Sequence, residues 1–521
     1  MKIRSLPFFS LLLALFSGIA TVFAFAPYGW WPIGIVSLAV TFHLVLRANS
    51  IRDSALIGWA YGFGWTGCGV YWLFISMHRF GGMSAWMAAL AVFLMALVLG
   101  AFSALAMAVG TWLRRRWSTS DAITALLLFP SLWTVTEWMR GWVFTGLPWV
   151  ASGYAHTSSP LSGYAPLVGV FGIGWFAALV AGCLALLPRT RMRYWMALCA
   201  LGIAVFAAGY GLGRIGWTEA SGKPIKVRLL QGNVPQEMKF ERDQITAALA
   251  LYHDMITAEQ ADLIATPETA VPVFARQLPP DYLPRLSKFA ERTGSHIALG
   301  IPINDSAWKY ANSVVGIGPH AAAEPGGFAY RYDKHHLVPF GEFVPTGFRW
   351  FVNMMRIPLG DFERGSALQT PFAVRDQWVL PNICYEDLFG EEIADQIAAG
   401  FYSGKGEATI LLNMSNIAWF GDTIALPQHL QISQMRALET GRPMLRATNT
   451  GTTAVIDPKG QVVAQLPSYS QAALSATVQG HRGATPYIRF GNTAIIALAF
   501  AMLFAARLLA GRATRTRALF R

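Results

Sequence analysis

Long apolar runs occupy most of the first 213 positions, and each approaches the length of a membrane-spanning helix. After the basic residues Lys2 and Arg4, one apolar run continues to Ala26. Further runs cover positions 29–46, 54–77, 85–112, 120–139, 162–187 and 194–213, and another covers 491–510 near the end of the chain. A helix needs about 20 such residues to cross the hydrocarbon core of a bilayer. The pattern therefore predicts eight spans, seven before a long polar insert and one after it.

The first apolar run has some features of a cleaved signal peptide, because Ala24-Phe25-Ala26 resembles a processing site. Pro27 directly after that site disfavours cleavage, and the run is long enough to cross a bilayer. We therefore interpret it as the first membrane span.

Arginine residues mark alternate connections between the predicted spans. The connections after spans two, four and six, together with the C-terminal tail, contain Arg47, Arg52, Arg114, Arg115, Arg116, Arg189, Arg191, Arg193, Arg512, Arg515, Arg517 and Arg521. The other short connections contain few basic residues, such as Arg79 and Arg140. Because positive connections stay on the cytoplasmic side, both termini are predicted to be cytoplasmic. We expect a multi-pass protein of a bacterial inner (cytoplasmic) membrane whose polar insert faces the periplasm.

The insert, from about residue 222 to about residue 487, alternates strand-like and helix-like segments. Strand-like runs occur at 225–231, 263–266, 296–301, 314–317, 378–384, 409–414 and 453–456, and helical spacing occurs at 243–260, 281–293 and 426–439. Such alternation is typical of a layered α/β domain. The sequence thus predicts spans one to seven in residues 1–218, an exported domain in 219–488, and the eighth span with a basic cytoplasmic tail in 489–521.

Composition narrows the class of protein. The chain is 54% hydrophobic and only 13% charged, whereas soluble chains carry about 25% charged residues. The net charge of +12 comes largely from basic residues at the ends of apolar runs, and the chain has no basic stripe interleaved with aromatic residues. The sequence therefore predicts a membrane protein without a nucleic-acid partner.

One cysteine lies outside the apolar runs. Cys68, Cys183 and Cys199 lie within those runs and are expected to be small buried hydrophobic residues. Cys384 instead follows a strand-like run and precedes a helix that we predict to begin near Asp387. Helical N–H groups would favour its thiolate form. The chain has no CxxC or Cys/His metal spacing, so no metal is expected.

A carboxylate and an ammonium group stand at similar positions in the insert. Glu268 directly follows the strand-like run at 263–266, and Lys334 follows another extended segment and precedes His335 and His336. Groups at the ends of strands can converge at one edge of a sheet. Glu268 could accept the thiol proton, and Lys334 could stabilise the thiolate and an oxyanion. A cysteine–histidine pair is an alternative that sequence spacing does not decide.

These motifs resemble the Glu–Lys–Cys triad of the nitrilase superfamily. The resemblance rests on three motifs: Pro-Glu-Thr-Ala around Glu268, Tyr-Asp-Lys-His-His-Leu-Val-Pro-Phe-Gly-Glu around Lys334, and Asn-Ile-Cys-Tyr-Glu around Cys384. With seven predicted spans before the insert and one after it, the chain resembles the membrane-embedded apolipoprotein N-acyltransferase family. The resemblance implies a nitrilase-like αββα sandwich domain inserted in a helical transmembrane bundle of eight spans.

The resemblance also implies an activity. Cys384 would take an acyl chain from a membrane phospholipid as a thioester and pass it to the amino group of the N-terminal S-diacylglyceryl cysteine of an apolipoprotein. Glu268 would serve as the base and Lys334 would hold the oxyanion. The reaction needs no cofactor, and the expected partners of the monomeric enzyme are the phospholipid donor, the diacylated apolipoprotein acceptor and the membrane.

The resemblance implies roles for further residues. Glu342 would orient the lysine, although a purely structural ion pair is an equal reading, and Tyr385 and Glu386 would form the pocket floor. Residues that we expect to contact lipid are Phe240, Gly146, Trp419 and Phe420. The apolar stretch at 347–359 is interpreted as a lid that enters the outer leaflet, with a short packed helix as the alternative.

Two other functions fit parts of the pattern. A membrane-tethered nitrilase-like amidase would hydrolyse a carbon–nitrogen bond with the same three residues, and water would resolve its acyl-enzyme. A non-catalytic scaffold that binds acylated proteins would have no use for a nucleophile. Eight spans beside the site suit two lipidic substrates better than a small soluble amide.

Overall fold

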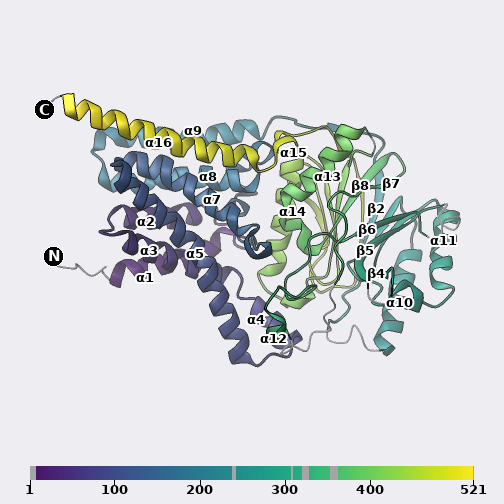
Figure 1. Ribbon diagram of the computed structural model, residues 1–521. Coiled ribbons are helices and arrows are strands. Elements are labelled where there is room, and N and C mark those ends of the chain that lie inside the picture. The colour runs from purple at the N-terminus through teal and green to yellow at the C-terminus, as the bar shows by residue number, and fades with distance from the viewer. Residues whose placement is uncertain are drawn as a thin grey trace. The chain divides into compact units, whose positions relative to one another are not determined.

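Apolar helices and strands belong to different units of the chain. The computed structural model describes residues 8–236, 242–306, 309–319, 328–352, 362–404 and 406–519. One unit comprises Met1–Phe74, Trp86–Ile215 and Phe490–Arg521, and the other comprises Ile75–Ala85 and Gly216–Arg489 (Figure 1). We call them the helical unit and the sheet unit. Two short helices, α4 (Leu73–Ile75) and α15 (Pro486–Phe490), lie where the chain passes from one unit to the other.

Helices lie at each predicted span of the helical unit. They are α1 (Phe8–Thr21), α2 (Trp31–Leu46), α3 (Ile51–Gly69), α5 (Ala85–Trp117), α6 (Asp121–Ile123), α7 (Phe129–Arg140), α8 (Ala165–Leu186), α9 (Trp195–Leu212) and α16 (Thr493–Leu519). Within the described ranges, five helical segments are long and apolar enough to cross a membrane: Ala85–Trp117, Asp121–Arg140, Pro160–Arg189, Met192–Leu212 and Thr493–Gly511. Phe8–Ala24 and Trp31–Leu46 are apolar but shorter.

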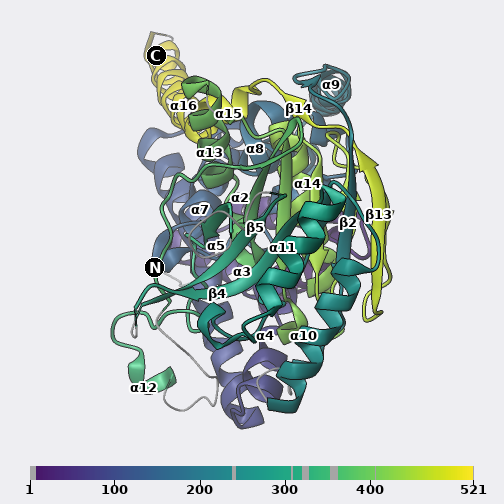
Figure 2. The same ribbon diagram turned by 90° about the vertical axis from the view of Figure 1, so that its right-hand side faces the viewer.

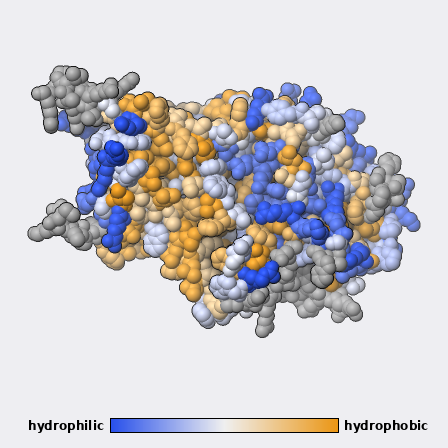
Figure 3. Space-filling model, in the orientation of Figure 1, coloured by the Kyte–Doolittle hydropathy of each residue, from blue (hydrophilic) through white to orange (hydrophobic). Residues whose placement is uncertain are grey.

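The helical unit exposes apolar side chains on its outer surface. In the most hydrophobic stretch of Pro160–Arg189, 83% of the residues are buried, whereas in the corresponding stretch of Met192–Leu212 only 17% are buried. Figure 3 shows hydrophobic residues gathered over the surface of this unit. An apolar surface of this extent is unusual for a protein surrounded by water and fits contact with lipid.

Three basic connections of the helical unit lie close together. Asp121 forms ion pairs with Arg114 and Arg189, each at 2.5 Å. Arg114 also donates to the carbonyl of Leu46 at 3.0 Å. Figure 1 shows that α1 begins and α16 ends at the same end of this unit. The connections after α2, α5 and α8 are therefore neighbours, although long apolar helices separate them in the sequence.

Two six-stranded sheets form the sheet unit. The first has the order β13-β2-β3-β4-β5-β6, and the second has the order β12-β11-β10-β9-β8-β7. The strands are β2 (Ile225–Gln231), β3 (Leu263–Ala265), β4 (His296–Asn304), β5 (Tyr310–Ile317), β6 (Tyr330–Asp333), β7 (Phe372–Val374), β8 (Gln377–Ile383), β9 (Ile410–Ser415), β10 (Met444–Thr448), β11 (Ala454–Ile456), β12 (Val462–Gln465) and β13 (Ala472–Val478). A separate pair joins β1 (Glu219–Ala220) to β14 (His481–Arg482). Three adjacent strands in each sheet are parallel, namely β2-β3-β4 and β8-β9-β10.

Helices cover the outer face of each sheet. The inner faces share one apolar core, in which Leu229 and Ala298 of the first sheet pack with Leu412 and Leu445 of the second. Helices α10 (Arg242–Thr257) and α11 (Tyr282–Thr293) pack against the first sheet, and α13 (Gly390–Ser403) and α14 (Ala425–Thr440) pack against the second. Figure 2 shows α10 and α11 in front of the first sheet. A short helix, α12 (Arg349–Val352), follows β6.

The sequence-based elements differ from the structure in two places that affect the site. The helix predicted to begin near Asp387 begins instead at Gly390, because a 3₁₀ turn occupies Cys384–Leu388. Strand β10 was not predicted, although it is fully buried in the centre of the second sheet. Its arginine, Arg446, interrupts the apolar run that would have revealed it.

Gly300 on β4 allows the chain around Glu268 to approach the sheet. A Cβ atom at Gly300 would lie 2.3 Å from the carbonyl oxygen of Pro267 and 3.1 Å from Cα of Glu268. The backbone N–H of Gly300 donates to Thr266 Oγ1 at 2.9 Å, and the N–H of Val271 donates to the Gly300 carbonyl at 3.0 Å. Because Gly300 has no side chain, the segment that contains Glu268 can lie directly against β4.

We expect Gly300→Ala to destabilise the protein and to displace Glu268. The added methyl group overlaps backbone atoms, and overpacking of this kind costs about 1–3 kcal/mol. The free energy of unfolding should fall by about that amount in a denaturant titration. Gly318→Ala is the matched control, because its Cβ would meet its nearest neighbour, His296 Cδ2, at an ordinary 3.4 Å. Equal stability of the two variants would contradict this account of Gly300.

Candidate active site

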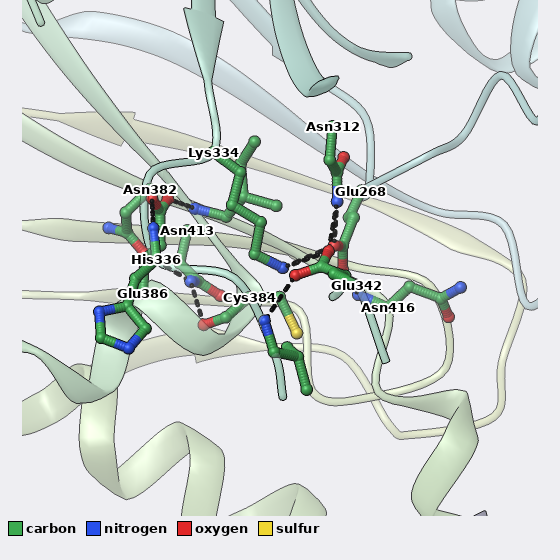
Figure 4. A network of polar contacts seen from close by, with 12 residues as sticks. Glu268, Asn312, Lys334, His336, Glu342, Asn382, Cys384, Glu386, Asn413 and Asn416 are labelled. Carbon is green, nitrogen blue, oxygen red and sulfur yellow. Dashed lines mark hydrogen bonds and ion pairs between the residues drawn. The ribbon is translucent and has the colours of Figure 1, made fainter. Parts of the chain in front are cut away.

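The three candidate catalytic residues come from both sheets. Glu268 follows β3 and Lys334 follows β6, which belong to the first sheet, whereas Cys384 follows β8 of the second sheet. The prediction that they meet at one edge of a single sheet is therefore wrong. They meet where the chains leaving the two facing sheets come together, and Figure 4 shows Lys334, Glu268 and Glu342 in contact with Cys384 beside them.

Lys334 lies between two carboxylates. Its Nζ donates to Glu342 Oε1 at 2.8 Å and to Glu268 Oε1 at 3.3 Å. Only 1% of the Lys334 side chain is exposed. Burial alone would lower the pKa of Lys334, but the carboxylates of Glu268 and Glu342 raise this pKa above its usual value. The ammonium group is therefore charged at neutral pH.

Asn312 and two backbone N–H groups fix the carboxylates. The side-chain Nδ2 of Asn312 donates to Glu268 Oε1 at 2.7 Å and to Glu342 Oε1 at 3.0 Å. The other oxygen of Glu268 accepts from the N–H of Asn416 at 2.9 Å, and the other oxygen of Glu342 accepts from the N–H of Val338 at 2.8 Å. Each carboxylate therefore has a single well-defined orientation around the ammonium group.

Asn312 was missed in the sequence, although a signal exists. It is a buried polar residue within β5, whose remaining residues are almost all buried. A polar side chain in an otherwise buried strand needs hydrogen-bond partners in the interior. A polar residue in a buried strand is therefore a candidate hydrogen-bond partner for carboxylates that follow neighbouring strands.

Cys384 has a strained backbone. Its φ is +53°, a region that costs a residue with a side chain on the order of 1–3 kcal/mol and occurs often at functional sites. The strain arises where the chain leaves β8 and turns at once into the 3₁₀ turn Cys384–Leu388. The position of this residue is therefore held by its surroundings rather than by local preference.

The sulfur of Cys384 is a thiol in the resting protein. Burial raises the pKa of Cys384 well above its usual value, and the carboxylate of Glu268 raises it further. Lys334 and the N–H of Asn416 act in the opposite direction but do not outweigh these effects. The α-helix expected directly after the thiol begins only at Gly390, so its N-terminal N–H groups do not directly follow Cys384. The thiol needs a proton acceptor when it reacts.

Glu386 joins the two sheets behind the triad. Its Oε2 accepts from the N–H of Ile383 at 2.6 Å and from the hydroxyl of Tyr332 at 3.0 Å. Its Oε1 accepts from the N–H groups of His335 at 2.6 Å and His336 at 3.2 Å. One buried carboxylate thereby connects the residue before Cys384 to the residues after Lys334.

The two adjacent histidines contact other groups. His335 Nδ1 lies 2.8 Å from the carbonyl of Gly365, and His336 Nδ1 lies 2.8 Å from Glu392 Oε1. The ring of His336 stacks on Phe389 with centroids 3.4 Å apart and lies 5.7 Å from the ring of the buried Tyr385. Among charged groups, Glu268 and Lys334 have the largest effects on the pKa of Cys384. The geometry thus favours the Glu–Lys–Cys arrangement over a cysteine–histidine pair.

The residues expected to contact lipid lie in different parts of the chain. Trp419 and Phe420 form the 3₁₀ turn Ala418–Phe420, close in sequence to Asn416. The ring of Trp419 packs on Phe80, 5.7 Å away, in the segment Ile75–Ala85 of the same unit. Gly146 belongs to the helical unit, where its φ is +81° in a turn against Gly141.

Two sequence-based expectations fall outside the described residues. Phe240 is one of them, and most of the predicted lid at 347–359 is the other. The described part of that stretch includes α12, Arg349–Val352, in which Trp350 is exposed.

A buried thiol beside a carboxylate and an ammonium group is an arrangement for covalent acyl transfer. The carboxylate can accept the thiol proton, and the ammonium group can stabilise an oxyanion. In the part of the chain that the structure describes, no group of three or more His, Cys, Asp and Glu side chains is placed to hold a metal ion.

The charges around Cys384 predict how its titration shifts. Because Glu268 raises the pKa of Cys384 and Lys334 lowers it, Glu268→Gln should lower this pKa and Lys334→Met should raise it. The measurement is the rate of Cys384 alkylation by iodoacetamide against pH, read from the mass of the peptide that contains it. The midpoint should move to lower pH in Glu268→Gln and to higher pH in Lys334→Met, with thermal melting as the folding control. Shifts in the reverse directions would contradict the assigned electrostatics.

Comparison with known proteins gives matches over nearly the whole chain. A family model described as the apolipoprotein N-acyltransferase N-terminal domain matches residues 17–183, and one described as carbon-nitrogen hydrolase matches residues 226–487. A protein of Ralstonia nicotianae named apolipoprotein N-acyltransferase is 50% identical over 497 residues, which cover 95% of this chain and 92% of that protein. A protein of the same name from Nitrosomonas europaea is 41% identical over 515 residues, which cover 96% of this chain and 98% of that protein.

A solved structure gives a weaker match to about half of the chain. The crystal structure of an amidase from Nesterenkonia sp. is 18% identical with a TM-score of 0.38, and the match covers 52% of this chain and 94% of that one. A TM-score this low supports no argument about chemistry, so the comparison rests on the family models and the two relatives.

Proposed function

Because the chain belongs to the apolipoprotein N-acyltransferase family, we propose that Cys384 carries an acyl chain from a phospholipid to a lipoprotein. The enzyme is an acyltransferase that acylates the amino terminus of lipoproteins through a thioester. The match of residues 17–183 to the family's N-terminal domain favours this activity over a membrane-tethered amidase. The observation that carries the residue assignment is the buried ammonium of Lys334 between Glu268 and Glu342, next to the thiol of Cys384.

The first half-reaction loads the cysteine. The sulfur of Cys384 attacks the ester carbonyl of a phospholipid while Glu268 accepts the thiol proton. The ammonium of Lys334, with nearby backbone N–H groups, stabilises the oxyanion of the tetrahedral intermediate. The intermediate collapses with loss of the lysophospholipid alkoxide, which receives the proton from Glu268, and the acyl chain stays on sulfur as a thioester.

The second half-reaction transfers the acyl chain from Cys384 to an amine. The amino group of an N-terminal S-diacylglyceryl cysteine attacks the thioester carbonyl, and Glu268 accepts a proton from that amine. The carbon–sulfur bond breaks, the Cys384 sulfur regains a proton, and the acyl chain ends in an amide. A thioester is reactive enough to acylate an amine directly, and covalent catalysis thus divides one difficult transfer into two easier steps.

Glu342, Glu386 and Tyr385 support the reacting groups in this account. Glu342 fixes Lys334 through the 2.8 Å ion pair and counterbalances its charge when Glu268 is protonated. Glu386 keeps the segment after Lys334 against the end of β8. Tyr385 forms part of the buried floor beside His336 and Phe389.

The helical unit suits eight spans in the inner membrane, with residues 219–488 in the periplasm. The arginine-rich connections alternate along the chain, and Asp121 joins two of them, through Arg114 and Arg189. The first residues of α1 and the last of α16 lie at the same end of this unit (Figure 1), which fits an even number of spans. This orientation puts the thiol on the side where mature lipoproteins and the outer leaflet are found.

Lipid contacts are assigned to Trp419, Phe420, Gly146 and Phe240, and the enzyme is taken to act as a monomer. The support for the first two is their half-buried position, close in sequence to Asn416, whose N–H group holds Glu268. An acyl chain that reaches Cys384 would pass near this turn. A monomer suffices because one chain supplies Glu268, Lys334 and Cys384.

The test of the proposed function is intact-mass measurement after incubation in micelles of phosphatidylethanolamine or phosphatidylglycerol. We expect a mass increase of one acyl chain per protein, which hydroxylamine removes because thioesters are labile to it. Cys384→Ala should gain no mass, while Cys199→Ala should gain as much as the unaltered protein. A folded protein that gains no acyl chain from either lipid would overturn the proposal.

A further inference from the structure

A histidine and an arginine behind the nucleophile have no part in the steps above. His429 lies on α14 and Arg446 on β10, and both side chains are fully buried. His429 Nε2 lies 3.2 Å from the backbone carbonyl oxygen of Cys384. Its other ring nitrogen, Nδ1, lies 2.9 Å from Nη2 of Arg446. The imidazole thus connects the guanidinium group to the backbone of the nucleophile.

The contacts define the tautomer of His429. A guanidinium group has only donors, so Nδ1 must accept from Arg446. The proton of the neutral ring therefore lies on Nε2, which donates to the carbonyl of Cys384. Burial and the charge of Arg446 lower the pKa of His429 well below its usual value, so the ring stays neutral.

Arg446 is itself anchored to the chain just beyond the nucleophile. Its Nη1 lies 3.5 Å from Asp387 Oδ2, and both side chains are inaccessible to solvent. The same nitrogen donates to Ser433 Oγ and to the carbonyl of His429 at 3.2 Å. Asp387 belongs to the same 3₁₀ turn as Cys384. The contacts form a closed path from Cys384 through Asp387, Arg446 and His429 back to Cys384.

The backbone of Cys384 needs such support. Its φ of +53° is unfavourable for a residue with a side chain. Strained backbone persists only where the surroundings over-determine it. The Cys384 carbonyl accepts from two buried side chains, His429 Nε2 and Asn413 Nδ2, the latter at 3.3 Å. Fixing this carbonyl restricts ψ of Cys384 and with it the orientation of the backbone that carries the sulfur.

We propose that Arg446 and His429 are positioning residues for the nucleophile. Arg446 selects the His429 tautomer with a proton on Nε2, and this N–H holds the Cys384 carbonyl so that the sulfur faces Glu268 and Lys334. The inference rests on the proposed function, because it assumes that Cys384 is the residue that becomes acylated.

Two amide substitutions of His429 separate its two hydrogen bonds, one donated to the Cys384 carbonyl and one accepted from Arg446. His429→Gln places an amide N–H at about the position of Nε2 and keeps a donor for the Cys384 carbonyl. His429→Asn places an amide oxygen at about the position of Nδ1, so it keeps an acceptor for Arg446 but offers no donor to Cys384. The two variants differ by one methylene group and have the same charge.

The measurement is the rate of acyl-enzyme formation at saturating phosphatidylethanolamine, followed by intact mass in the full-length protein. We expect His429→Asn to lower this rate by about tenfold, as loss of one hydrogen bond of average strength would. His429→Gln should stay within about threefold of the unaltered protein. The lipid concentration for half-maximal rate should not change in either variant, and both should melt at similar temperatures.

The outcomes distinguish the two proposals. If the unaltered protein forms no acyl-enzyme, the proposed function is wrong. If the unaltered protein is acylated and His429→Asn reacts as fast as His429→Gln, the positioning role is wrong. An equal loss of rate in both variants, with unchanged melting temperatures, would also overturn the positioning role. The amide N–H that His429→Gln retains would then fail to restore the rate.

Discussion

The buried ammonium of Lys334 is the charge on which the site depends. A lone ammonium group in this interior would be strongly disfavoured, and two carboxylates, Glu268 and Glu342, compensate it. Removing one partner of a buried ion pair typically costs about 3–5 kcal/mol. The same three charges set the chemistry. In the proposed mechanism, Glu268 accepts the thiol proton and the Lys334 ammonium stabilises the oxyanion.

Desolvation explains why the thiol of Cys384 rests in its protonated form. Burial raises its pKa, so the protein avoids a second buried anion beside Glu268. In the proposed mechanism, the thiolate is generated during attack, when the proton moves to Glu268 and Lys334 gains a new negative partner.

Local signals in the sequence predicted Glu268, Lys334 and Cys384 as candidate catalytic residues, but not the residues that surround them. Glu268, Lys334 and Cys384 each end a strand-like run, and the hydropathy pattern located the helices α5, α8 and α16. The pattern did not reveal which sheet holds each strand, because pairing depends on contacts far apart in sequence. Asn416, for example, holds Glu268 across 148 positions.

The sequence indicated that the Cys384 thiol needs a base, but it did not reveal that burial raises the pKa of this thiol. Its pKa depends on burial, which only the packing of both sheets creates. His429 and Arg446 looked like ordinary polar positions of a helix and a loop, and their link to Cys384 appears only when β10 is placed beside β9. Five of the eight predicted spans meet the length and hydropathy of a membrane helix in the described residues. Helices α1 and α2 are shorter than the runs that predicted them, and α3 is long enough but does not reach the required hydropathy.

The central claim is that the acyl chain on Cys384 passes to an amine. The most direct test isolates the protein after loading with a radiolabelled acyl chain, removes free lipid, and adds a diacylated lipopeptide with either a free or an acetylated N-terminus. The account predicts that the label moves to the free-amine peptide as a hydroxylamine-stable amide and remains on the protein with the acetylated one. Release of the label as free fatty acid at the same rate with both peptides would contradict it.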